Sequence, residues 1–169
     1  PDLVQTGVNE PAQLNLFLYR VAPSAALRNN DLPSRDRNGE RLTNPPLALD
    51  LHYLLSAYGA EELYSEALLG YGMQVLHEVP FLSRQYIRNT FPGGTGDPIE
   101  QALAESGLAE QIEYLKIAPE TLSTEEMSKL WTAFQAKYRP STGYVVTVVL
   151  IQSNLPARAP LPVLTQGEN

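Results

Sequence analysis

The sequence predicts an α+β fold with about four mostly antiparallel strands, flanked by helices on one face of the sheet. Two long apolar runs with period two near the start and a β-branched run near the end predict strands. Segments with helical spacing lie between these runs. The 169 residues are expected to form one domain over 1–153, with an extended Pro-rich tail over 154–169.

Two apolar runs predict the first two strands. In the first, over 15–21, both faces are apolar, which indicates a strand that is buried on both sides or covered by a neighbour. The second, Leu47–Tyr58, also alternates with period two, and the prolines before it favour a strand. Its leucines and alanines leave a helix as the alternative.

A long connection, residues 24–46, joins these two strands. Asn38 and Gly39 form a strong tight-turn signal within it. A connection of this length is typical of a functional arm or a small hairpin. Its arginines are nearly balanced by acidic residues, which favours ion-paired contact with another protein over phosphate binding. A merely solvated loop is the other reading.

The middle of the chain is expected to be helical. Glu61–His77 has apolar residues at three- and four-residue spacing, which predicts a mostly buried helix. Glycines inside it, at 70 and 72, suggest that another backbone passes close by. Phe81–Asn89 and Ile99–Ser106 are expected as shorter helices, the second capped by Asp97.

The last third of the chain is expected to be strand, helix, strand and tail. Glu110–Ala118 alternates as a strand does. Ser123 and Glu126 form a capping box at the start of a helix that reaches Tyr138. Tyr144–Ile151 is β-branched and apolar on both faces, so it is expected at the centre of the sheet.

Composition excludes several classes of function. The chain has no cysteine, which rules out disulfides, thiolate nucleophiles and zinc–thiolate sites. The net charge is −7, and the acid is concentrated in the middle of the chain, which argues against a nucleic-acid partner. No apolar run has the length of a membrane span.

Candidate chemistry is sparse. The two histidines, His52 and His77, lack the spacing of metal ligands, so no metal and no cofactor is expected. Asp50, His52 and Ser56 share one face of the second strand, and a small hydrolase or ligand-binding domain using this face is the alternative function. An interface or packing role is favoured, and the protein is expected not to be an enzyme.

Several segments, taken in order, resemble one family. They read LNLFLYRVAPSAALRNNDLP, LALDLHYLLSAYG, LLGYGMQVLHEVP and EEMSKLWTAFQAKYRPSTGYVVTVVLIQS. As a set they are similar to the cap, or tube-terminator, proteins of extracellular contractile injection systems, which are phage-tail-like particles of the antifeeding-prophage type. The resemblance covers nearly the whole chain, from about Leu14 to Pro162.

The resemblance implies a fold like that of phage tail terminators and a structural role. It implies a homohexameric ring that ends growth of the inner tube and the sheath, with the tube and sheath proteins as partners. Assembly is expected in the bacterial cytoplasm, in a particle that can be released. The residues expected at interfaces are Arg28, Asn29, Arg35, Arg37, Arg41, Asp50 and His52.

Overall fold

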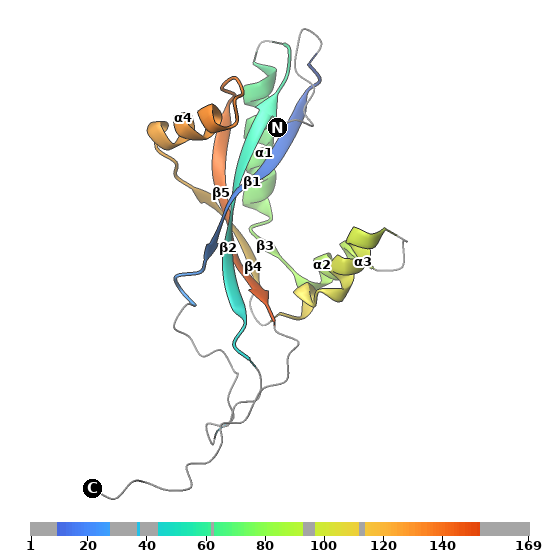
Figure 1. Ribbon diagram of the computed structural model, residues 1–169. Helices are drawn as coiled ribbons and strands as arrows, with labels where there is room; N and C mark the ends of the chain where they lie inside the picture. Colours follow the sequence, from blue (N-terminus) through green and yellow to red (C-terminus); the bar gives the residue numbers. More distant parts are fainter. Residues whose placement is uncertain are drawn as a thin grey trace, which may run out of the picture.

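The computed structural model describes residues 10–27, 37, 44–61, 63–92, 97–111 and 114–152. These residues form one five-stranded sheet in the order β1-β2-β5-β4-β3, and every neighbouring pair is antiparallel (Figure 1). The elements are β1 (Gln13–Pro23), β2 (Leu47–Tyr58), α1 (Tyr64–Glu78), β3 (Phe81–Leu82), α2 (Arg84–Thr90), α3 (Pro98–Glu105), the 3-10 helix η1 (Leu108–Glu110), β4 (Leu115–Glu120), α4 (Thr124–Ala133) and β5 (Ser141–Ile151). The α+β prediction is confirmed, with one strand more than expected.

The strands β2 and β5 form the centre of the sheet. β2 pairs with β1 on one side and with β5 on the other, so the strand reading of Leu47–Tyr58 is confirmed over the helix alternative. β5 lies between β2 and β4, as its apolar faces predicted. The residues at the end of β2 are the most deeply buried in the sheet, because helices cover both of its faces there.

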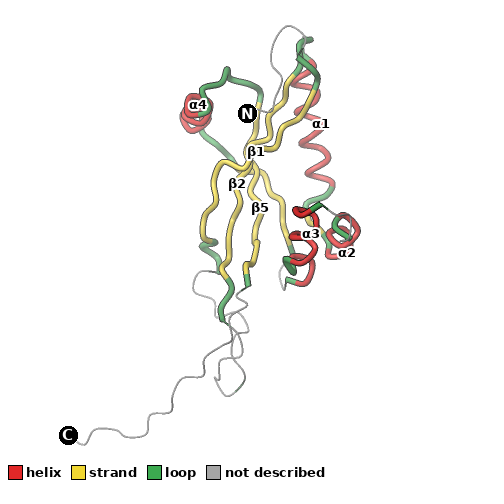
Figure 2. The backbone as a smooth tube through the Cα atoms, turned by 45° about the vertical axis from the view of Figure 1, so that its right-hand side comes forward, coloured by secondary structure: helices red, strands yellow, loops and turns green. Residues whose placement is uncertain are grey.

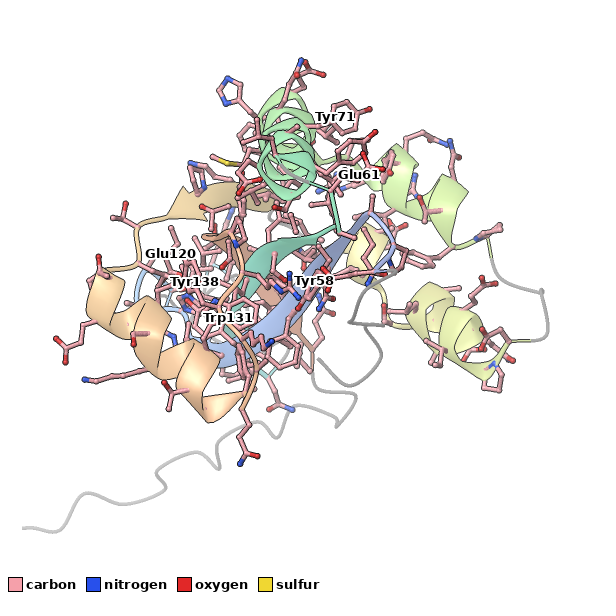
Figure 3. All side chains as sticks on the ribbon, turned by 90° about the horizontal axis from the view of Figure 1, so that it is seen from above. Tyr58, Glu61, Tyr71, Glu120, Trp131 and Tyr138 are labelled. Atoms are coloured by element: carbon pink, nitrogen blue, oxygen red, sulfur yellow. The ribbon has the colours of Figure 1, made fainter. Side chains whose placement is uncertain are left out.

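Helices lie on both faces of the sheet, which corrects the expectation that they cover only one. Leu54 packs with Trp131 of α4, whereas the next residue, Leu55, lies against Gly72 of α1. Consecutive strand residues point to opposite faces, so α1 and α4 lie on opposite sides (Figure 2). Figure 3 shows the same arrangement from above, with Tyr71 on the α1 side and Trp131 on the α4 side.

Strand β1 lies at an edge of the sheet beside β2, and its leucines on the α1 side are partly exposed, so the expectation that it is buried on both sides is wrong. Only β2 pairs with it among the described strands. Leu14, which touches α1, is 37% exposed, and Leu16 and Leu18 are 50% and 40% exposed. A second apolar face in the sequence therefore marks an open surface here and not an interior.

Helix α1 was expected to be mostly buried, and that expectation is also wrong. Gly72 is its one buried residue among those described, while Tyr64 and Tyr71 are 52% and 63% exposed. The helix packs against β1 and β2, and at Gly72 it lies against the side chains of Leu14 and Leu55. Side chains of Leu14 and Leu55, and not another backbone, lie close to Gly72, and Gly70 has open space where a Cβ would be, so the backbone approach inferred from the glycines is not found.

Local signals set most helix ends. Asp97 accepts a hydrogen bond from the Ile99 N–H at 2.9 Å and caps α3 as expected. The capping box of α4 is present, with Ser123 and Glu126 each bonded to the other's backbone N–H. This helix ends at Ala133, earlier than predicted, because the chain reverses at Gln135, where φ is 52°.

Two other boundaries differ from the predictions. Phe81 and Leu82 form the short strand β3 and not the first turn of a helix, because Ser83 caps α2 by accepting the Tyr86 N–H at 3.1 Å. Residues 108–110 form η1, and β4 begins only at Leu115.

Two glycines give a matched test of the packing. An alanine Cβ at Gly143 would lie 2.9 Å from the backbone oxygen of Glu120, so Gly143→Ala is expected to lower the free energy of unfolding by about 1–3 kcal/mol. At Gly70 a Cβ meets nothing within 4 Å, so Gly70→Ala is expected to raise the free energy of unfolding by about 1 kcal/mol. Urea unfolding of both variants measures the difference, and equal stabilities would contradict the close packing of β5 on β4.

Candidate functional site

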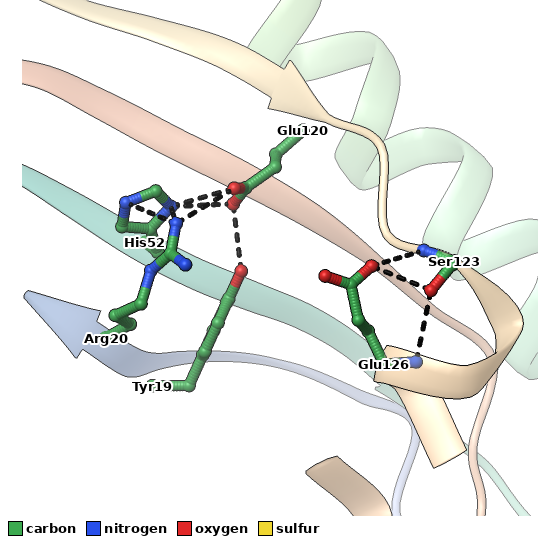
Figure 4. A network of polar contacts seen from close by, with 6 residues as sticks. All are labelled: Tyr19, Arg20, His52, Glu120, Ser123 and Glu126. Atoms are coloured by element: carbon green, nitrogen blue, oxygen red, sulfur yellow. Dashed lines mark hydrogen bonds and ion pairs between the residues drawn. The ribbon is translucent and has the colours of Figure 1, made fainter. Parts of the chain in front are cut away.

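Four side chains form a polar cluster on the α4 side of the sheet. The Tyr19 hydroxyl donates to Glu120 Oε2 at 2.9 Å, and His52 Nδ1 lies 2.8 Å from the same oxygen (Figure 4). Arg20 Nη2 lies 3.0 Å from His52 Nε2 and 3.5 Å from Glu120 Oε1. The cluster therefore connects the edge strand β1 with β2 and with the end of β4.

An irregularity in β1 places two consecutive residues in this cluster. Leu18 pairs with Tyr53, but Arg20 pairs with His52, so Tyr19 is an extra residue in the ladder. A bulge of this kind turns neighbouring side chains toward the same face. Both the Tyr19 hydroxyl and the Arg20 guanidinium consequently reach Glu120, which regular alternation would not allow.

Burial and charge fix the roles within the cluster. The His52 side chain is 9% exposed and that of Glu120 is 21% exposed, while Arg20 is 56% exposed. Burial, and then the hydrogen bond to Glu120, raise the pKa of Tyr19 to about 12. The phenol therefore remains a proton donor to the carboxylate. The same Arg20 Nη2 lies 3.1 Å from His52 Nδ1 and 3.0 Å from Nε2, so the imidazole is held between the Arg20 guanidinium and the Glu120 carboxylate.

Helix α4 begins three residues beyond this cluster. The Ser123 backbone N–H and hydroxyl both donate to the Glu126 carboxylate and lower its pKa (Figure 4). The cap holds the first turn of α4 beside Glu120. The capping box therefore fixes the start of α4 next to the polar cluster that connects β1, β2 and β4.

The cluster differs from the catalytic alternative predicted from Asp50, His52 and Ser56. His52 is bonded to Glu120 and Arg20, and the Ser56 hydroxyl faces the Asn15 carbonyl at 3.5 Å. Asp50 lies where the pairing of β2 with β5 shifts register, between Leu49 and Leu51. The three residues make no nucleophile–base–acid relay in the described structure.

No metal site emerges either. No group of three or more histidine, cysteine or acidic side chains in the described residues could hold an ion. None of the helices in that part of the chain is long and apolar enough to cross a bilayer.

A groove of about 520 Å³ lies between α4 and the start of β5. Trp131, which is 5% exposed, lies at its base and Tyr138, 65% exposed, at its rim. His52 and Asp50 do not line it. The lining residues are Leu122, Thr124, Met127, Ser128, Trp131, Thr132, Ala136, Tyr138 and Ser141.

A second buried ion pair was not foreseen from the sequence. Glu10, whose side chain is 3% exposed, accepts from Arg139 Nη2 at 2.7 Å and from the Gly59 N–H at 3.0 Å. The guanidinium of Arg139 also lies over the ring of Tyr58. This contact joins the start of β1, the end of β2 and the start of β5, and no local pattern links residues so far apart in the chain.

The predicted interface residues belong either to β2 or to the arm, residues 24–46. His52 and Asp50 lie on β2, His52 within the polar cluster and Asp50 half-buried. Arg37 is exposed. The other arm residues, Arg28, Asn29, Arg35 and Arg41, lie outside the described residues.

Comparison with solved structures defines the class of protein to which this fold is similar. The fold is similar to that of a PVC sheath/tube terminator from an extracellular contractile injection system, in its extended state. The TM-score is 0.57 and the sequence identity 16%, over 96% of this chain and 51% of that chain. The anti-feeding prophage tube-terminating cap is also similar, with a TM-score of 0.44 and 14% identity over 100% of this chain and 55% of that one. The chain thus spans about half the length of either structure.

A family model identifies the chain more closely. The model of the Pvc16 N-terminal domain matches residues 1–165, and the chain belongs to that family. No curated protein matches the chain. The resemblance drawn from the sequence motifs is confirmed by the family and by the fold.

Proposed function

We propose that this protein is the cap of a contractile injection system particle, a structural subunit that terminates the inner tube and the sheath. The observation that carries the proposal is the fold it shares, over nearly its whole length, with a sheath/tube terminator. Membership of the Pvc16 N-terminal domain family supports the same role.

The surface of the subunit supports assembly over catalysis. Large apolar side chains remain exposed on β1, on α1 and at β3. Exposed apolar surface of this extent is typical of contact with other subunits. The polar cluster at His52 is satisfied within the chain and connects strands, so it acts as a structural clamp.

The assembled form we propose is a homohexameric ring that docks on the last tube hexamer. The ring offers no equivalent surface to a further hexamer, so growth stops. Assembly takes place in the bacterial cytoplasm, and the particle can then be released. The tube and sheath proteins are the partners.

Deleting the gene and imaging the particles tests this function. Without the cap, tubes and sheaths are expected to lose their uniform length or to fall apart, and the complete protein supplied in trans is expected to restore them. Measurement of particle lengths by negative-stain electron microscopy gives the result. Particles of normal and uniform length in the deletion strain would overturn the proposal.

The charged arm, residues 24–46, is the part we expect to reach neighbouring subunits or the sheath. Reversing Arg35, Arg37 and Arg41 to glutamate changes the arm from near neutrality to strong negative charge. Ring formation is expected to fall by at least about tenfold, because like-charge contacts replace ion pairs across the interface. Counting rings in negative-stain images measures the loss.

The matched control reverses three exposed lysines, Lys116, Lys129 and Lys137, to glutamate. The change in net charge is the same, so a general charge effect would appear in both variants. Normal rings and normal particle length in the arm variant would show that the arm is a solvated loop.

A further inference from the structure

The two edges of the sheet differ in how they are protected. The β4 edge carries Pro119, which has no N–H to offer to a further strand. Strand β3, with two residues, covers the start of β4, and the Ile117 N–H already donates to the Pro80 carbonyl at 2.8 Å. This edge therefore offers a further strand only the two residues of β3 and, beyond them, a stretch of β4 that lacks the N–H of Pro119.

The β1 edge is open by comparison. From Gln13 to Leu18 the strand has no charge and no proline, and no described strand pairs with its outer side. Lysine, proline, short length and β-bulges are the usual protections of an edge strand, and in β1 the bulge at Tyr19 and Pro23 both lie beyond this stretch. Arg20, the nearest charge on the strand, is held by His52 and Glu120 on the α4 side.

The side chains along this edge are symmetric in sequence. Residues 14–18 read Leu-Asn-Leu-Phe-Leu, with all three leucines on the α1 side of the sheet and 37–50% exposed. An antiparallel copy centred on Leu16 would place Leu14 opposite Leu18 and Leu16 opposite itself. Directly opposed side chains share a face, so each leucine would meet a leucine without any charge nearby.

We propose that free subunits pair through β1, edge to edge about a two-fold axis at Leu16, with a second copy of this chain as the occupant. The edges are asymmetric: because the opposite edge offers only the two residues of β3 and a stretch of β4 with Pro119, pairing along a long strand uses β1 on both copies. Such pairing extends two five-stranded sheets into one of ten strands. The pairing itself does not rest on the proposed cap function, whereas its place in assembly rests on the proposed ring.

The pairing has a definite place in assembly. A contact that is two-fold cannot also be the repeating contact of a six-fold ring. The dimer therefore belongs to the unassembled subunit, where it covers a strand edge that would otherwise attract other strands.

Because the chain has no cysteine, a single introduced thiol gives a direct test. On mild oxidation, Leu16→Cys is expected to form a disulfide-linked dimer at least about tenfold faster than Ile99→Cys, since Cβ atoms of opposed residues lie about 5 Å apart. Ile99, on α3, is 69% exposed and provides the background rate. Equal rates for the two variants would overturn the proposal.

A double variant separates the two-fold pair from a head-to-tail contact. Phe81, on the opposite edge, is 53% exposed. If β1 of one copy met the other edge of the next, Leu16→Cys with Phe81→Cys would give a ladder of linked oligomers while Leu16→Cys alone gave none. That result would also overturn the proposal.

Sedimentation of the unlinked protein provides the second measurement. Leu16→Lys places two ammonium groups opposite each other in the pair and is expected to raise the dimer dissociation constant at least about tenfold, with the circular dichroism of the fold retained. Ile99→Lys is expected to leave the constant unchanged. A wild-type protein that is monomeric at about 100 μM would contradict the pairing.

Discussion

Replacing Trp131 with alanine is expected to lower the free energy of unfolding by about 3–5 kcal/mol. Trp131 is 5% exposed and packs with Leu54 and Tyr58 of β2. Its indole N–H donates to the Ser141 hydroxyl at 3.1 Å. The variant loses both the apolar contacts and the hydrogen bond that hold α4 on the sheet.

Urea unfolding followed by circular dichroism measures this loss. The neighbouring ring of Tyr138 is 65% exposed, so Tyr138→Ala is expected to cost no more than about 1 kcal/mol. A Trp131→Ala variant no less stable than Tyr138→Ala would show that α4 does not pack on the sheet as described.

Replacing Arg139 with alanine is expected to lower the free energy of unfolding by about 3 kcal/mol. The change leaves the Glu10 carboxylate, 3% exposed, with the Gly59 N–H as its remaining partner among the contacts described. It also removes the guanidinium from the ring of Tyr58. A buried charge without its counter-ion is costly because the protein interior solvates it poorly.

The control is an ion pair of similar length in a different setting. Arg88 and Glu110 lie 2.6 Å apart, but their side chains are 49% and 67% exposed. Arg88→Ala is therefore expected to cost less than about 1 kcal/mol. If Arg88→Ala and Arg139→Ala lowered the free energy of unfolding equally in thermal or urea unfolding, burial of the Glu10–Arg139 ion pair would make no difference to its contribution to stability.

The parts of the fold that could be predicted are those set by neighbouring residues. Two helix caps depend only on spacings of two or three residues, so they can be recognised in the sequence. They are the capping box of Ser123 and Glu126 and the cap at Asp97. The alternation of Leu47–Tyr58 was enough to identify a strand against weak propensity. These signals are local, so tertiary structure does not change them.

Burial could not be predicted in the same way. The apolar residues of β1 and α1 were read as interior because sequence alone cannot distinguish a face covered within the subunit from one left open. Tyr71 and Leu16 are both exposed, and both look like core residues by type. Apolar residues that contact another chain show the same spacing in the sequence as apolar residues that pack inside the subunit.

The candidate site shows the same limit. His52 was identified, but the partner considered for it in the hydrolase alternative was Asp50, two residues away, whereas its partner in the structure is Glu120, 68 residues away. The bulge that brings Tyr19 and Arg20 together leaves no mark in the alternation of residues around it. Long-range pairing decides such contacts, and a single sequence does not display it.

The short strand β3 has a mechanical consequence. Force applied along the strands would load the β1–β2–β5 ladder in shear, so that many backbone hydrogen bonds would have to break together. β3, in contrast, joins α2 to the sheet through two residue pairs, which can open one after the other, whereas α1 also packs directly on β1 and β2. The long strands therefore form the stiff axis of the subunit, and the connection through β3 is its compliant joint.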